Sequence, residues 1–216
     1  MNFQAIIFDM DGVLADSEPL WDDIDAAMLR LHGVSYAGEH KHHVLGKGFP
    51  LALAFYKEQY QLEATIEELT QQRLGIAAEY YATRIEAFSD AATLLPMLRE
   101  RGFKLGLATS SLSTLALSFL DRYHLRDYFH AIVTGEDVQR GKPNPDIYLK
   151  AAQKLNVEPK YCLVVEDSLA GVQAGKSAGM PVAAIPDPRF VNIEDFKNKA
   201  DFILARLGEV AKLVEH

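Results

Sequence analysis

Short apolar runs that alternate with helical patterns constrain the fold of this chain more than any other sequence feature. Continuous runs of four or five apolar residues are typical of strands buried on both faces of a parallel sheet. The runs are Ala5–Phe8, Lys104–Ala108, Ala131–Thr134, Cys162–Val165, Val182–Ile185 and, more weakly, Asp201–Leu204. Helical patterns lie between the later runs, at about Asp90–Glu100, Thr114–Tyr123, Asp146–Leu155 and Leu169–Ala178. The alternation predicts an α/β fold with ligands at the carboxyl ends of the strands.

One long segment after the first run breaks this alternation. Between Asp16 and about Ala87 the sequence has helical periodicity and no convincing strand. A crossover between parallel strands needs only one helix, so this segment is too long to be one. We therefore expect a separate helical cap domain at residues 17–86, inserted into an α/β core domain formed by residues 1–16 and 87–216. Such a cap can open and close over the ends of the strands.

Composition and charge exclude several classes of protein. The 216 residues include 22 Lys and Arg against 30 Asp and Glu, which gives a formal charge of −8 and argues against binding to nucleic acid or to an anionic membrane. A hydrophobic content of 49% excludes a disordered chain. No apolar stretch approaches the 18 or so residues that span a bilayer. The single cysteine cannot form an internal disulfide, which suits a reducing cytoplasm, so we expect a cytoplasmic protein. No sequence feature marks an interface, so a monomer is the default.

The first candidate for chemistry is the sequence Asp9-Met10-Asp11-Gly12, directly after the first apolar run. Two carboxylates at the carboxyl end of a buried strand project into the crevice where α/β proteins bind ligands. A local turn in which one aspartate and Gly12 satisfy backbone groups is the alternative. A calcium loop is excluded, because it needs Asp or Asn at the position of Val13 and Gly at the position of Leu14.

A second acidic pair, Glu166-Asp167, follows the run that begins at Cys162. Parallel strands that end at the same edge would bring this pair beside Asp9 and Asp11. Alternatively, Asp167 or Ser168 caps the next helix, and both roles are compatible. Four carboxylates in one crevice repel each other and cannot all stay ionised without cations. An oxygen-only set of this kind suits Mg²⁺, which leads us to expect Mg²⁺ as the cofactor.

Two further elements offer groups that bind phosphate. Lys142 stands in a turn stiffened by two prolines, which favours a fixed cationic position, although an exposed turn lysine is the plain alternative. Thr109, Ser110 and Ser111 follow the run that begins at Lys104, and their hydroxyl and backbone N–H groups can hold phosphate oxygens. A cluster of this kind often caps the following helix instead.

These four elements, in this order, resemble the haloacid dehalogenase superfamily of phosphotransferases. The segment from Phe8 to Trp21 is similar to the β-phosphoglucomutase-like branch of that superfamily, and within it to phosphatases that act on hexitol or 2-deoxyglucose 6-phosphates. The resemblance covers essentially the whole chain. It implies a Rossmann-like parallel core with an α-helical cap between the first and second motifs. The motifs are Asp9-x-Asp11-Gly12, Thr109, Lys142 and Glu166-Asp167.

The resemblance also implies a role for each motif residue. Asp9 would attack phosphorus to form an aspartyl phosphate, and Asp11 would act as general acid and then general base. Mg²⁺ would be held by Asp9, the backbone carbonyl of Asp11 and Asp167, with Glu166 a ligand or a close neighbour. Three groups would hold the transferring phosphoryl oxygens: the side chain of Thr109, the backbone of Ser110, and Lys142.

The segment 17–86 departs from the mutase pattern. A histidine of the mutase is replaced by Trp21, and the loop 44–50 lacks the arginine that grips a second phosphate. Trp21 would close over the carbon skeleton of a substrate or simply pack inside the cap, and Lys47 would contact substrate or stay solvated. We therefore expect a Mg²⁺-dependent phosphatase of small phosphorylated metabolites, such as sugar or polyol phosphates. A hexose phosphate mutase is the alternative. Dehalogenases and phosphonate hydrolases are disfavoured because those branches lack the second aspartate.

Overall fold

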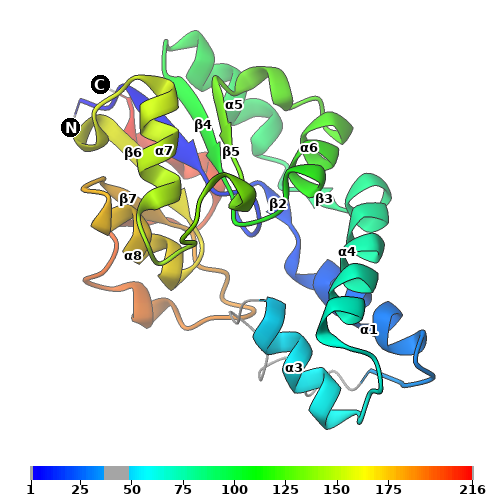
Figure 1. Cartoon of the computed structure of the whole chain (residues 1–216). Helices are drawn as coiled ribbons and strands as arrows, with labels where there is room; N and C mark the ends of the chain where they lie inside the picture. The colour runs from blue at the N-terminus through cyan, green and yellow to red at the C-terminus, as the bar shows by residue number, and fades with distance from the viewer. Residues whose placement is uncertain (1, 37–48, 216) are drawn as a thin grey trace. The chain divides into compact units, whose positions relative to one another are not determined.

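The structure is a computed structural model that describes residues 2–36 and 49–215, with the side chains of residues 49 and 50 left out. Its residues form two compact units, one of 1–16 with 86–216 and the other of 17–85. Each unit has its own helices, coloured along the chain in Figure 1. The two are described separately below.

The first unit is built on a six-stranded sheet with all neighbouring strands parallel, in the order β5-β4-β1-β6-β7-β8. This confirms the predicted α/β class. The strands are β1 (Ala5–Phe8), β4 (Lys104–Ala108), β5 (Ala131–Val133), β6 (Cys162–Glu166), β7 (Val182–Ala184) and β8 (Phe202–Ile203). The helices are α5 (Ala91–Glu100), α6 (Ser113–Arg122), α7 (Asp146–Leu155), α8 (Leu169–Ser177) and α9 (Val210–Leu213). Short 3₁₀ turns connect them: η2 (Arg126–Tyr128), η3 (Gly135–Asp137), η4 (Pro159–Tyr161), η5 (Ile193–Phe196) and η6 (Leu207–Glu209).

The centre of this sheet is buried on both faces, as the continuous apolar runs require. All four residues of β1 and all five of β6 are buried. Alternate side chains point to opposite faces, so Ala5 and Ile7 join one core cluster together with residues of α7 and α8. Figure 1 shows these two helices in front of the sheet. Because β1 is flanked by β4 and β6, the residues that follow these three strands lie at one edge.

Two short strands lie where the sequence indicated none. β2 (Ala15–Asp16) and β3 (Glu86–Ala87) pair antiparallel, with Ala15 opposite Ala87. They are the two passages of chain between the α/β unit and the helical segment. A two-residue strand has no measurable alternation of apolar and polar positions, so pattern reasoning does not detect it.

The second unit is helical in its described residues. Its helices are α1 (Glu18–Arg30), α3 (Phe49–Gln59) and α4 (Ile66–Thr83). A capping box between Thr65 and Glu68 begins α4. Its apolar core contains Met28, Leu29, Leu53, Tyr56, Leu62 and Leu69. An ion pair is buried nearby, in which Arg73 Nε lies 2.5 Å from Asp25 Oδ1, and the Tyr56 hydroxyl donates to Asp25 Oδ2 at 2.8 Å.

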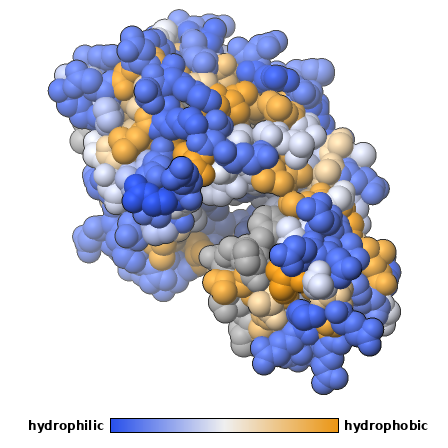
Figure 2. Space-filling model, viewed as in Figure 1, coloured by the Kyte–Doolittle hydropathy of each residue, from blue (hydrophilic) through white to orange (hydrophobic). Residues whose placement is uncertain are grey.

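The exposed residues are mainly hydrophilic on the face shown in Figure 2, with hydrophobic residues in small scattered patches. In the described part of the chain, no helix has the length and apolar character needed to cross a membrane.

Candidate active site

The carboxyl ends of β1 and β6 bring the two acidic motifs together. Asp9 follows β1 and its backbone N–H donates to the carbonyl of Val165 at 2.9 Å, which continues the pairing of the two strands. Glu166 is the last residue of β6, and Asp167 comes next. Asp9, Glu166 and Asp167 each place a carboxylate oxygen within 4.8 Å of the others. The expected juxtaposition of these acids is therefore present.

A tight turn holds the first motif against the second. Gly12 has a φ of +75°, and a β-carbon at this position would lie 2.0 Å from Oδ2 of Asp167. Both the backbone conformation and the space therefore require glycine. The Asp9–Gly12 loop lies directly on Asp167, as a site shared by the two motifs needs.

Lys142 lies between the acids and is buried. Its side chain is only 6% exposed, and its Nζ lies 3.0 Å from Asp9 Oδ2 and 2.6 Å from Glu166 Oε1. The ring of Tyr148 lies below it, with the ring centroid 5.2 Å from Nζ. The alternative of an exposed lysine in a turn is therefore wrong. Tyr148 is also fully buried, and its hydroxyl donates to Glu166 Oε1 at 2.8 Å.

Glu166 is surrounded by five hydrogen-bond donors. Oε1 accepts from Lys142 Nζ and the Tyr148 hydroxyl. Oε2 accepts from the backbone N–H of Asp167, the backbone N–H of Ser168 and the Ser168 hydroxyl, each at 2.9 Å. A carboxylate has about four lone-pair sites, so these donors use its whole accepting capacity. Ser168 also caps α8 by accepting from Gly171 N–H at 3.0 Å, so the capping role belongs to Ser168.

The residues after β4 lie at the same edge of the sheet. Thr109 is buried, its N–H donates to the carbonyl of Val133, and its hydroxyl accepts from the N–H of Ser111 at 3.0 Å. The Ser111 hydroxyl donates to Asp11 Oδ2 at 2.7 Å. None of these hydroxyls caps α6, because its N-terminal Ser113 N–H is bound by Glu136. The capping alternative for this cluster is therefore wrong.

Burial and mutual repulsion govern the charges of the site. Burial, with Glu166 and Asp11 adding repulsion, raises the pKa of Asp9 to about 8 despite the attraction of Lys142. Burial, followed by repulsion from Glu166 and Asp9, also raises the pKa of Asp167 well above its usual value. Burial opposes ionisation of Glu166 too, but Lys142 and the hydrogen bonds keep the pKa of Glu166 low. Protons or a cation must therefore compensate the charge between Asp9 and Asp167.

This donor set fits a magnesium ion. Asp9 and Asp167 supply carboxylate oxygens close together, in a site where excess negative charge is buried. Mg²⁺ commonly binds to one or two carboxylates and completes its shell with water and substrate phosphate. Glu166 fits less well as a direct ligand because its oxygens are already bound by five donors.

The two remaining predicted residues belong to the segment 17–86. Trp21 is half-buried in α1, where the Arg73 guanidinium lies 4.6 Å from its ring centroid and the Tyr81 ring 5.9 Å away. These contacts show that Trp21 packs within its own unit. Lys47 lies outside the described residues.

Sequence reasoning missed Tyr148 and the partnership of Ser111 with Asp11. Tyr148 occupies an apolar position of α7, where the pattern reads it only as core. Ser111 belongs to the predicted hydroxyl cluster, but its partner is 100 residues away in the sequence. No spacing signal indicates either contact.

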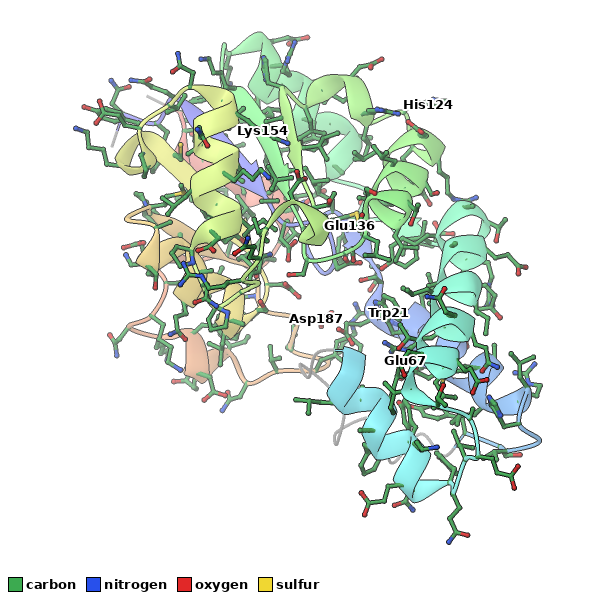
Figure 3. All side chains as sticks on the ribbon, viewed as in Figure 1. Trp21, Glu67, His124, Glu136, Lys154 and Asp187 are labelled. Carbon is green, nitrogen blue, oxygen red and sulfur yellow. The ribbon has the colours of Figure 1, made fainter. Side chains whose placement is uncertain are left out.

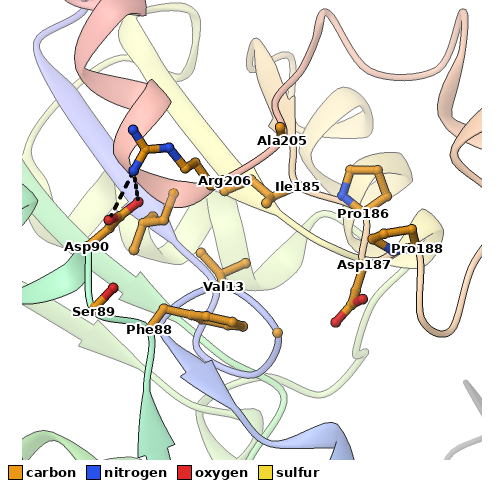
Figure 4. Close-up of a pocket in the computed structure, with 12 residues that line it drawn as sticks. Val13, Phe88, Ser89, Asp90, Ile185, Pro186, Asp187, Pro188, Ala205 and Arg206 are labelled. Atoms are coloured by element: carbon orange, nitrogen blue, oxygen red, sulfur yellow. Dashed lines mark hydrogen bonds and ion pairs between the residues drawn. The ribbon is translucent and has the colours of Figure 1, made fainter.

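A cavity of about 340 Å³ adjoins the Gly12–Val13 turn in the α/β unit. Figure 4 shows the apolar side chains that line it and the ion pair between Arg206 and Asp90 at one end. Asp9, Lys142 and Asp167 do not line this cavity. Of the first acidic motif, only Gly12 lines the cavity.

Comparison with known proteins identifies the family. The sequence profile of the haloacid dehalogenase-like hydrolases matches residues 6–185. The chain belongs to this family. It is 33% identical to the phosphorylated carbohydrates phosphatase of Thermotoga maritima over 177 residues, covering 82% of each chain. It is 31% identical to hexitol phosphatase B of Escherichia coli K12 over 195 residues, covering 87% of this chain and 88% of the relative.

A solved structure of the family shares the fold. CbbY from Rhodobacter sphaeroides, solved in complex with phosphate, superposes with a TM-score of 0.84 at 25% identity and covers 96% of each chain. Together with the phosphatase relatives, this confirms the resemblance to haloacid dehalogenase-like sugar-phosphate phosphatases. The chain is a phosphoric monoester hydrolase of this family.

Proposed function

We propose that this hydrolase is a Mg²⁺-dependent phosphatase of sugar or polyol monophosphates. The observation that carries the proposal is the arrangement of Asp9 and Asp167 at the carboxyl ends of the neighbouring strands β1 and β6, with Lys142 reaching Asp9 from the loop before α7. Lys142 Nζ lies 3.0 Å from Asp9 Oδ2, and Asp9 and Asp167 have carboxylate oxygens close enough together to bind one ion. The named activities of the two bacterial relatives support sugar or polyol phosphates as substrates.

Asp9 is the proposed nucleophile. Its Oδ1 accepts from the backbone N–H of Met10 at 2.8 Å, which fixes the carboxylate plane. One oxygen of Asp9 attacks phosphorus, and the bond from phosphorus to the sugar oxygen breaks. The product is a phosphoryl group on Asp9, which splits one difficult step into two easier ones.

Asp11 is the proposed general acid and base. It donates a proton to the departing alcohol, and then accepts a proton from the water that attacks the aspartyl phosphate. The second step releases inorganic phosphate and restores the Asp9 carboxylate. The Ser111 hydroxyl, at 2.7 Å from Asp11 Oδ2, orients this carboxylate.

The remaining polar groups bind charge. The hydroxyl of Thr109, the backbone N–H of Ser110 and Lys142 are proposed to hold the phosphoryl oxygens, and positioning of this kind supplies most of the catalysis in phosphoryl transfer. Asp9, the Asp11 carbonyl and Asp167 are proposed to hold Mg²⁺, which when bound neutralises charge on the phosphoryl group. Glu166 keeps Lys142 and the 167–168 backbone in place through its five hydrogen bonds.

The helical unit is proposed to act as a cap that selects the substrate. Trp21 would contact the carbon skeleton, and its packing on Arg73 fixes the ring. Lys47 is a second candidate contact from this segment. A hexose phosphate mutase would use the same aspartyl phosphate but return the phosphoryl group to a sugar rather than to water.

A phosphate-release screen tests the proposal. Purified protein is incubated with Mg²⁺ and with sugar, polyol and nucleotide monophosphates, and free phosphate is measured. We expect release from sugar or polyol phosphates that stops when the metal is chelated. Asp11→Asn should lower turnover by orders of magnitude, whereas the matched exposed variant Asp195→Asn should not. An absence of hydrolysis would contradict the proposal, and phosphoryl transfer without free phosphate would indicate the mutase.

A further inference from the structure

Glu136 lies beside the proposed phosphate-binding residues and takes no part in the reaction described above. It belongs to the turn η3, which follows β5 at the same edge of the sheet as the loop 109–111. Its Oε2 accepts from the backbone N–H of Ser113 at 2.7 Å and from the Ser113 hydroxyl at 2.6 Å. Figure 3 shows Glu136 between β5 and α6.

The turn that carries Glu136 is fixed to the phosphate-binding loop. Gly135 N–H donates to the carbonyl of Ser111 at 3.1 Å. A β-carbon on Gly135 would lie 2.4 Å from the carbonyl oxygen of Ser110, so the two loops are in direct contact. Asp137 closes a capping box with Thr134, which holds the other side of the turn. The carboxylate of Glu136 is therefore held at a defined place.

This place is close to the reacting groups. Ser113 is two residues after Ser111, so their Cα atoms are separated by at most about 7 Å. The hydroxyl of Ser111 in turn touches Asp11, the proposed general acid. Atoms of a substrate that extend from a phosphate at 109–111 towards α6 would therefore meet the negative charge of Glu136.

The carboxylate of Glu136 keeps its charge at neutral pH. The two hydrogen bonds from Ser113 lower its pKa, and both donors are uncharged. Backbone N–H groups at the start of a helix attract anions, but here the carboxylate already binds the first of them, that of Ser113. A second anionic group of a substrate would meet repulsion where the helix end would otherwise attract it.

We infer that Glu136 is a specificity-determining residue that disfavours substrates with a second anionic group, such as hexose bisphosphates, relative to sugar and polyol monophosphates that carry no charge apart from the reacting phosphate. The inference rests on the proposed phosphatase function of the same site. It deepens that function by stating which substrates are rejected and by which side chain.

Glu136→Gln tests the inference, because glutamine keeps an oxygen that can accept from Ser113 but removes the charge. The kcat/KM values for a hexose 6-phosphate and a hexose 1,6-bisphosphate are measured for the wild type and for the variant. Glu100→Gln is the matched control, since Glu100 ends α5 just before the amino end of β4, at the opposite edge of the sheet.

We expect Glu136→Gln to raise the bisphosphate-to-monophosphate ratio of kcat/KM by about three- to ten-fold, through KM rather than kcat, as for one charge acting across a solvated distance. Glu100→Gln should leave the ratio unchanged. Raising salt to about 0.5 M should raise the ratio of the wild type but not that of Glu136→Gln. If Glu136 is only a structural cap, neither Glu136→Gln nor added salt changes the bisphosphate-to-monophosphate ratio of kcat/KM. That result would overturn the inference.

A binding measurement separates this inference from the proposed reaction. Both sugar phosphates are titrated into Asp9→Asn protein with and without Glu136→Gln, and dissociation constants are measured by calorimetry. A selective gain in bisphosphate affinity supports the role of Glu136 even if wild-type hydrolysis is absent. Equal affinities in the two proteins, or no binding of either sugar phosphate, would overturn it.

Discussion

Replacing Asp9 by asparagine should stabilise the metal-free protein at alkaline pH while it abolishes hydrolysis. Asp9 is buried beside two other acids, and its pKa is raised from 3.8 to about 8. The folded state therefore binds more protons than the unfolded state between these two values. Its contribution to stability is fully present below about pH 4 and is lost as the pH rises towards 8. Asparagine does not titrate, so Asp9→Asn escapes this loss.

The size of the effect follows from the same pKa. At about 1.4 kcal/mol per pH unit, a shift from 3.8 to about 8 corresponds to an upper bound of about 6 kcal/mol. Water entry and local rearrangement reduce the cost of a buried charge, so we expect a gain of about 2 to 3 kcal/mol at pH 8. At pH 5, where Asp9 carries its proton in the folded state, the change should be much smaller.

Urea unfolding with a metal chelator measures this gain. The free energy of unfolding is determined for the wild type and Asp9→Asn at pH 5 and at pH 8. The change caused by Asp9→Asn at pH 5 is then subtracted from the change that it causes at pH 8. Asp195→Asn, an exposed acid, should give no such pH-dependent gain. Mg²⁺ should stabilise the wild type more than Asp9→Asn. If Asp9→Asn is equally or more destabilised at pH 8 than at pH 5, the reasoning about this site is refuted.

Three further substitutions test contacts that lie within one or the other of the two units. Gly171→Ala puts a β-carbon 1.6 Å from Glu166 Oε1, so we expect a loss of about 2 kcal/mol or more in urea unfolding, although alanine favours a helix. Lys142→Met leaves two buried acids without their lysine and should cost about 3 to 5 kcal/mol and most of the phosphate release; unchanged stability would contradict the geometry. Arg73→Leu should cost a similar amount by leaving the buried Asp25 without its counter-ion, and Asp25→Asn in the same protein should recover part of it, as measured by thermal unfolding.

The sequence predicts the sheet well because its strands are buried on both faces. The runs at Ala5–Phe8 and Lys104–Ala108 match β1 and β4 at both ends. Two other runs of four residues are less accurate, since β5 ends one residue before the predicted Thr134 and β7 one before Ile185. A run of apolar residues shows where a strand lies, but it does not mark the residue at which pairing with the neighbouring strand ends.

The meeting of the acids is predictable, but their partners are not. Parallel strands end at one edge, and that rule alone places Asp9 near Asp167. The rule does not say that Tyr148 donates to Glu166 or that Glu136 binds Ser113, because these contacts depend on which loops adjoin and how their side chains fill the space. The Asp25–Arg73 pair escapes prediction for the same reason, since 48 residues separate its members.

The proposed sharing of one divalent cation by Asp9 and Asp167 is tested most directly by crystals grown with Mn²⁺, measured at the manganese absorption edge. We predict one anomalous peak bonded to a carboxylate oxygen of Asp9 and one of Asp167, with Glu166 still bound to Lys142 and Tyr148. A peak bonded to Glu166 in place of Asp167, or a fully loaded crystal with no peak between the two aspartates, would contradict the proposed site.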